Sequence, residues 1–230
     1  AMFFMTFFME NVHGLDPIAT GVRLLPMTGM MIVGAPLAGQ VITKIGPRVP
    51  MVAGMLLAAI ALFGFSRISA TSSLNDTIIW FALLGLGLSP VMVGATEVIV
   101  GNAAVELAGV AAGLQSTAMQ IGGTIGTAVL GAIMSAKVDS LLPARWAAAQ
   151  LPALSPEQLA AAKSATTVGV APIQNGMSPQ LAASIADVTH ATFISGMTAS
   201  FLVAGIVAVV GALVALLTKK RPAPANQADG

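Results

Sequence analysis

Apolar stretches without charged residues recur along the chain, and short polar segments separate them. Several of these stretches reach the roughly 20 residues that a transmembrane helix needs. They show neither the polar face of a soluble helix nor the period-2 alternation of a transmembrane strand. The pattern therefore predicts an all-α polytopic membrane protein with complete spans at residues 18–43, 50–67, 77–101, 108–136 and 189–218.

Eight of the first nine residues are apolar, and this stretch before Glu10 is too short to cross a bilayer. It has neither the basic start nor the small-residue cleavage site of a signal peptide. We expect residues 1–9 to be the outer end of a span whose first part lies outside this sequence. A helix lying flat at the membrane interface is the alternative.

Proline marks the expected starts of the first two complete spans. Asp16 precedes Pro17, so a capping carboxylate would stand before a proline at the first helical position. Pro50 is expected at the first helical position of the next span. Prolines inside spans, at positions 26, 36 and 90, are expected to bend or loosen their helices.

The segment 137–188 also carries helix signals. The run from Ser155 to Gln158 has the pattern of a capping box and predicts a short helix that ends near Ser164. Ser178, followed by a proline, predicts the start of a helix that leads into the last span.

Basic residues set the expected orientation. Lys44 and Arg48 lie between the first two complete spans, and residues 219–221, after the last span, are all basic. Both groups are expected in the cytoplasm, and the number of spans between them agrees with that. Residues 137–188 then form an outer loop, and residues 222–230 a disordered cytoplasmic tail.

Composition narrows the classes of function. Charged residues make up 8% of the chain and apolar residues 56%, whereas a typical soluble domain has about 25% charged residues. The net charge of +1, without basic clusters interleaved with aromatic residues, gives no support for a nucleic-acid partner. The absence of cysteine excludes disulfides and thiol catalysis.

Enzyme signatures are also missing from the sequence, which has no P-loop, nucleotide-binding glycine fingerprint or Gly-x-Ser-x-Gly motif. His13 and His190 are far apart in the sequence, so no metal site is expected. Asp187 and His190 lie three residues apart at the outer mouth of the last span. They are either a proton-handling pair or, the favoured interpretation, part of a helix start bathed in water. We expect neither an enzyme nor a bound cofactor.

Small residues recur at helical spacing within the spans. Gly122, Gly123 and Gly126 in one span, and Gly85 and Gly87 in the preceding one, would let helices approach closely in lipid. Such faces suit a protein whose helices rock against each other, and they equally suit a rigid bundle. The sequence leaves both interpretations open.

Few polar side chains fall inside the spans. Glu97 lies near the expected cytoplasmic end of its helix, and an intramembrane carboxylate is a candidate proton carrier. At that depth it is also able to reach interfacial water. Gln115, Ser116, Met119 and Gln120 are the candidate substrate-cavity residues, and Ser116 and Gln120 share one helical face. Lining a solvated cavity and hydrogen bonding between helices are equally consistent roles for the polar members.

Two blocks of sequence resemble the C-terminal half of major facilitator superfamily transporters. The similarity is greatest to the fourteen-span drug:proton antiporter branch (EmrB/QacA type) and covers roughly residues 1–220. It implies the C-terminal six-helix half of a major facilitator fold with the first helix truncated. The first block comprises residues 21–27 (GVRLLPM), 36–39 (PLAG) and 44–48 (KIGPR), and the second comprises residues 85–88 (GLGL), 108–113 (AGVAAG) and 120–126 (QIGGTIG).

The resemblance also implies a cytoplasmic gate loop. The candidate gate residues that match the family pattern are Gly39, Lys44, Gly46 and Arg48, whereas Thr43 stands where the pattern has an acid. Substrate would bind near the midplane between two halves, and the principal membrane-embedded acids would belong to the N-terminal half.

The expected function follows from this resemblance. It is part of a proton-coupled multidrug efflux antiporter of the bacterial cytoplasmic membrane, with the C-terminus inside and the proton gradient as energy source. The expected partners are the lipid bilayer, a small amphipathic substrate and the N-terminal half of the same transporter. Two alternatives stay open: a major facilitator exporter of a sugar, siderophore or amino acid, and a non-transporting remnant or scaffold, which the departure at Thr43 favours.

Overall fold

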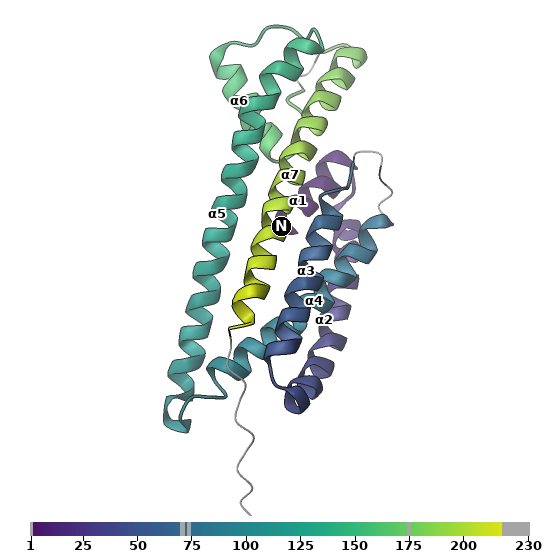
Figure 1. Ribbon diagram of the computed structural model, residues 1–230. Coiled ribbons are helices and arrows are strands. Elements are labelled where there is room, and N and C mark those ends of the chain that lie inside the picture. The colour runs from purple at the N-terminus through teal and green to yellow at the C-terminus, as the bar shows by residue number, and fades with distance from the viewer. Residues whose placement is uncertain (1, 70–71, 73–74, 174–175, 218–230) are drawn as a thin grey trace, which may run out of the picture.

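The computed structural model describes residues 2–69, 72, 75–173 and 176–217 (Figure 1). Helices make up most of this part of the chain. Two of them are short irregular turns, the π-helical η1 and the 3₁₀-helical η2. The elements in chain order are α1 (Met2–Phe7), η1 (Phe8–Val12), α2 (Pro17–Ile45), α3 (Arg48–Phe65), α4 (Asp76–Ile99), η2 (Val105–Leu107), α5 (Ala108–Ala148), α6 (Pro156–Thr167) and α7 (Pro179–Ala215).

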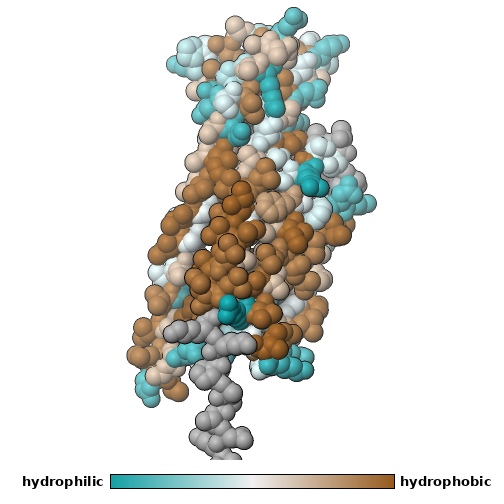
Figure 2. Space-filling model, viewed as in Figure 1, coloured by the Kyte–Doolittle hydropathy of each residue, from teal (hydrophilic) through white to brown (hydrophobic). Residues whose placement is uncertain are grey.

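Five of the described helices are long and apolar enough to cross a membrane: α2, α3, α4, α5 and α7. They correspond one by one to the five expected complete spans. Figure 2 shows hydrophobic side chains over the middle of the molecule and hydrophilic ones gathered toward its two ends. That distribution matches a hydrocarbon layer between two aqueous phases.

The predicted capping residues do what their sequence pattern indicates. The Asp16 carboxylate accepts a hydrogen bond from the backbone N–H of Ala19 at 2.6 Å. Ser155 and Gln158 form both hydrogen bonds of the capping box, and the Ser178 hydroxyl accepts one from the N–H of Leu181. Helix α6 then continues to Thr167, slightly beyond its expected end near Ser164.

One predicted helix start is wrong. Helix α3 begins at Arg48, with Pro47 as its N-cap, so Pro50 is the third helical residue rather than the first. The N–H groups of a whole first turn have no partner within the helix. A proline is therefore tolerated throughout that turn, and its presence alone does not fix the first residue.

The segment expected as an outer loop is largely helical. Helix α5 continues past residue 136 to Ala148, and the helix that Ser178 predicts is continuous with the last span, so that α7 is one helix from Pro179 to Ala215. The reason lies in buried side chains at intervals of four: Met134, Val138, Leu142 and Trp146. This apolar stripe keeps α5 packed on α7 beyond the ends of the other helices, and the α5–α6–α7 end projects past α2, α3 and α4 in Figure 1.

The long helices pack in the order α2, α4, α3, α7, α5, so α2 and α5 form the two edges of the bundle (Figure 1). A core of phenylalanine side chains joins the central helices. The Phe65 ring of α3 lies 4.9 Å from the Phe81 ring of α4 and 5.5 Å from the Phe201 ring of α7, centroid to centroid. The edge helices are the least covered of the five.

Glycine faces behave differently on two helices. On α4 a Cβ added at Gly87 would lie 2.7 Å from the backbone of both Ala58 and Gly54 on α3, so only glycine allows this approach. The expected close packing is confirmed there. On α5 no other described atom lies within 4 Å of a Cβ added at Gly122, Gly123 or Gly126. That face packs on nothing in the described part of the chain.

Prolines interrupt none of the spans. Helix α2 runs continuously through Pro26 and Pro36, and α4 through Pro90. Each proline removes one backbone hydrogen bond from its helix. Whether that loosens the helices in transport stays a prediction.

Only one of the two groups of basic residues that set the expected orientation lies among the described residues. The turn with Lys44 and Arg48 lies at the same end of the bundle as the end of α7 (Figure 1), which agrees with the expected parity. The basic residues 219–221 and the tail 222–230 lie outside the described residues.

Candidate functional site

The open face of α5 carries a polar stripe along an otherwise apolar helix. Thr117, Gln120 and Thr124, with Ile121 and Ile125, line an open hollow of about 360 Å³. Both threonine hydroxyls donate to carbonyl oxygens one turn back in α5, at 2.9 Å. The Gln120 amide has no hydrogen-bond partner among the described residues. Its two donors and its acceptor are therefore available at the edge of the hollow.

The predicted cavity residues separate into two groups. Ser116, Met119 and Gln120 are exposed on the uncovered side of α5. Gln115 is half-buried and donates a hydrogen bond of 2.8 Å to the hydroxyl of Thr96 on α4. The two glutamines are five residues apart, which places their side chains about 140° apart around a helix. The structure therefore does not bring Gln115 and Gln120 to one site.

Glu97 lies in the last turn of α4, as expected, and is half-buried. Its carboxylate folds back beside Gly101, where an added Cβ would lie 3.0 Å from the carboxyl carbon. Asn102 completes this helix end by donating to the carbonyl oxygen of Val98 at 2.9 Å. Since Thr96 is the neighbouring residue, the carboxylate and the Gln115 hydrogen bond belong to the same region of the α4–α5 contact.

The gate-loop candidates surround the tight turn between α2 and α3. Gly46 has φ +83° and ψ 167°, a conformation available essentially to glycine alone. Lys44 is exposed and Arg48 is half-buried on the other side of the turn. Gly39 lies one to two turns earlier with open space around it. The turn explains the glycine at position 46, and the gating role of the four residues stays a prediction.

A second group of polar residues lies where η1 and the start of α2 meet α7. His13, between η1 and α2, is held near Arg23 of α2 and His190 of α7. Burial, and next the positive charges of Arg23 and His190, hold the pKa of His13 below its ordinary value of 6.5. Asp187 is exposed and His190 is half-buried. Both lie more than two turns inside α7, which begins at Pro179, so the interpretation of this pair as part of a helix start is wrong.

Sequence reasoning missed Arg23 as part of this group. The sequence did offer one signal, because Arg23 is a cation at the boundary of an apolar run. A cation in that position needs either a polar partner or contact with water. The pairing of residues from opposite ends of the chain carries no sequence signal. Among the described residues, no group of three or more His, Cys, Asp or Glu side chains is placed to hold a metal ion.

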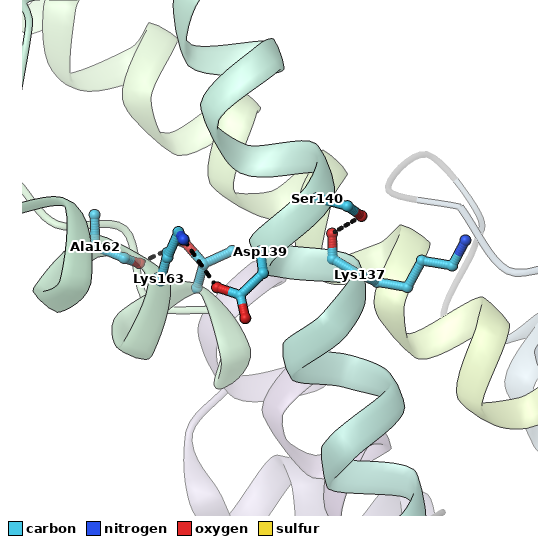
Figure 3. A network of polar contacts seen from close by, with 6 residues as sticks. Lys137, Asp139, Ser140, Ala162 and Lys163 are labelled. Carbon is cyan, nitrogen blue, oxygen red and sulfur yellow. Dashed lines mark hydrogen bonds and ion pairs between the residues drawn. The ribbon is translucent and has the colours of Figure 1, made fainter.

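Polar contacts also hold the projecting end together. Lys163 of α6 forms an ion pair with Asp139 of α5 at 3.0 Å, whereas Lys137 points to the other side of α5 (Figure 3). The guanidinium of Arg145 donates to the Ser195 hydroxyl of α7 at 3.0 Å, and the Trp146 indole donates to the carbonyl oxygen of Pro152 at 2.9 Å. Next to this indole lies a hollow of about 350 Å³ between α5, α6 and α7.

Comparison with known proteins identifies a transporter family. The family model described as Major Facilitator Superfamily matches residues 1–127. The tetracenomycin C resistance and export protein of Streptomyces glaucescens is 53% identical over 219 residues, which are 95% of this chain and 41% of that protein.

Two further relatives are more distant. The multidrug resistance protein Stp of Mycobacterium tuberculosis is 33% identical over 60% of this chain and 25% of its own length. The methyl viologen resistance protein SmvA of Salmonella typhimurium is 26% identical over 81% of this chain and 36% of its own. The chain thus spans less than half the length of each of these curated relatives.

Proposed function

The chain belongs to the major facilitator superfamily of transport proteins, and on that premise we propose that it forms the C-terminal six-helix half of a drug exporter. The exporter would be a proton-coupled antiporter of small amphipathic compounds in the bacterial cytoplasmic membrane. Its branch would be the fourteen-span drug:proton antiporters. The names of the relatives, which include resistance and export proteins, support the substrate class.

The uncovered face of α5 is the observation that carries the proposal. This face carries glycines at positions 122, 123 and 126 and a polar stripe at Thr117, Gln120 and Thr124. Neither feature is expected on a helix surface that contacts lipid alone. Glycines on this face let another helix approach closely, while the stripe offers hydrogen bonds to a ligand. We infer that the other half of a longer transporter covers this face and that substrate binds against Gln120, with Ser116 and Met119 beside it.

Apolar, adaptable walls fit loosely specified substrates. Met119 is 48% exposed on the open side of α5, and methionine fills irregular space because its side chain is flexible and polarizable. Amphipathic drugs differ in shape more than in polarity. A wall of methionine, isoleucine and small residues with a few amide and hydroxyl groups would accept many of them.

Glu97 and the turn at Gly46 would serve the cytoplasmic side. A carboxylate in the last turn of α4 faces the negative end of the helix dipole, so helix stability does not account for it. We propose that Glu97 exchanges a proton with water at that end. Lys44 and Arg48 would bind the other half when the inner gate closes, since both project from a turn whose shape Gly46 fixes.

Export itself is tested with the complete gene in a bacterial strain that lacks its own drug exporters. Resistance to tetracenomycin C, methyl viologen and ethidium should rise, and a protonophore should abolish ethidium efflux. Gln120→Ala should alter the resistance profile, whereas Gln180→Ala, which removes an exposed glutamine at the outer start of α7, should leave it unchanged. Efflux that continues without a proton gradient would rule out proton coupling.

A scaffold without transport activity is the second candidate function, and Thr43 is the observation that favours it. The Thr43 hydroxyl donates to the Gln40 carbonyl oxygen of its own helix at 2.9 Å, so it offers no negative charge to a gate cation. Wild-type protein that reaches the membrane in normal amounts but changes resistance to none of the three compounds would support this candidate. Export of a sugar, siderophore or amino acid would instead appear as substrate-dependent proton release in vesicles.

A further inference from the structure

Buried polar atoms without a partner occur on the segment from η1 to α2 and on α7. In the described part of the chain, four side chains have a buried nitrogen or oxygen atom without a hydrogen-bond partner: His13 at Nε2, Thr20 at Oγ1, Arg23 at Nε and Thr189 at Oγ1. Three of them belong to the segment from His13 to Arg23, and Thr189 precedes His190. Buried polar atoms are nearly always satisfied, so these four are available to a further partner, and Arg23 and His190 both act electrostatically on His13.

Aromatic and amide contacts hold this cluster closed. The Phe8 ring of η1 lies edge-on to the His13 ring, with centroids 4.7 Å apart. Asn11, in the same π-helical turn, donates to the carbonyl oxygen of Val168 at 2.7 Å. Gly169 packs between Asn11 and Phe193 of α7, where an added Cβ would be 3.5 Å from each. The π-helical turn thus ties the start of α2 to α6 and α7 next to the two histidines.

Charges around His13 come from three directions. Arg23 of α2 and His190 of α7 both act on it electrostatically, and Asp187 acts on His190. Glu10 and Asp16 lie three residues to either side of His13 on its own segment. Burial, and next the two basic side chains, lower the pKa of His13 and so disfavour its protonated form in the closed arrangement.

We propose that His13, with Arg23 and His190, forms a proton-binding site at the outer end of the bundle whose occupancy separates the η1–α2 segment from α7. The lone pair of Nε2 accepts a proton from outer water, with the other ring hydrogen on Nδ1. The new imidazolium is then repelled by the Arg23 guanidinium, and the repulsion opposes the contact that Asn11 and Gly169 make. Water entering the opened cluster satisfies both cations.

The site would supply the transporter with a proton acceptor on the outer side, from which protons move inward down their gradient. This role rests on the proposed function, but the proton-driven opening does not. Opening and export are therefore measured separately on the same protein, expressed from its complete gene.

Paired spin labels report the opening directly. The chain contains no cysteine, so Ile18→Cys on α2 and Ser184→Cys on α7, both at exposed positions, introduce label sites once any cysteines elsewhere in the protein are replaced by serine. From pH 8 to pH 5, a longer-distance population should rise about tenfold in the otherwise wild-type protein. In His13→Gln the short distance should persist at both pH values, and in His13→Lys the long distance should persist at both.

Arg67→Gln is the matched control, because it removes a cation at the outer end of α3 and should leave the pH response unchanged. A wild-type distance that is the same at pH 5 and pH 8, or a full pH response in His13→Gln, overturns the proposal. The comparison of pH 5 with pH 8 in the otherwise wild-type protein does not depend on the folding of any His13 variant. If the pH response follows His13 but no drug is exported, the proton-binding site stands and the proposed function fails. If drug export is driven by protons but the distance does not change with pH, the proposed function stands and the proton-binding site fails.

Discussion

The Gln115 amide of α5 donates a hydrogen bond of 2.8 Å to the Thr96 hydroxyl of α4, one residue before Glu97. This bond joins two helices that otherwise contact each other little, since α5 packs mainly on α7. We therefore expect a change at Gln115 to affect the helix end that carries the carboxylate. We predict that Gln115 is a positioning residue, whereas Gln120 faces the open side of α5.

Removing either partner of this bond should have the same effect. Gln115→Ala and Thr96→Val are each expected to change the drug-resistance profile in the same direction, and the double variant should resemble either single one. The lost bond is worth about 1 kcal/mol, and partners in one hydrogen bond are not additive. Gln120→Ala combined with Gln115→Ala should give additive changes instead. Additivity between Gln115 and Thr96 would show that the bond does not matter for export.

Alanine at Gly87 should destabilise the bundle. The added methyl group would meet the backbone of α3 at 2.7 Å, and overpacking of this kind costs about 1–3 kcal/mol. Thermal unfolding in detergent micelles measures the loss. Gly126→Ala is the control, because the space around Gly126 is open in this chain and alanine is the better helix former by about 1 kcal/mol.

The same control variant tests whether another part of the protein covers α5. In the complete transporter, Gly126→Ala should become destabilising, since a packed helix would then occupy the open space. The same effect in the 230-residue chain and in the complete protein, without any destabilisation, would mean that lipid rather than protein covers this face.

Acidification should weaken the contact between the η1–α2 segment and α7. Burial and two basic neighbours lower the pKa of His13 in the folded protein below its ordinary value of 6.5, so the unfolded chain binds more protons than the folded one. The stability contributed by neutral His13 is therefore complete above pH 6.5 and is lost as the pH falls below that value. The melting temperature should decline between about pH 7 and pH 5, and the decline should be smaller in His13→Gln.

Helix α6 should depend more on its cap than on its ion pair. Ser155→Ala removes a capping hydrogen bond and should cost about 1 kcal/mol. Lys163→Met removes the ion pair with Asp139, whose side chain is 59% exposed, and should cost about 0.5 kcal/mol or less. Hydrogen–deuterium exchange across residues 156–167 distinguishes the two. A larger effect of Lys163→Met that persists at high salt would reverse this order.

Local patterns along the chain were sufficient for the elements themselves. Five apolar stretches with few charged residues correspond to five long helices, because a bilayer requires every backbone polar group to be bonded within its own segment. Asp16, Ser155 and Ser178 marked helix starts, because a short polar side chain satisfies N–H groups of the first turn wherever the rest of the chain lies. The family resemblance rested on the same kind of contiguous residues.

Only the tertiary structure decided which of these residues meet. Glycines recur within both α4 and α5 in the sequence, yet those of α4 pack on α2 and α3 while those of α5 remain open, because the order of packing places α5 at an edge. Gln115 and Gln120 looked like one site and face different ways. His13, Arg23 and His190 looked unrelated and share one site, since burial and charge act through space and leave no periodic trace in the sequence.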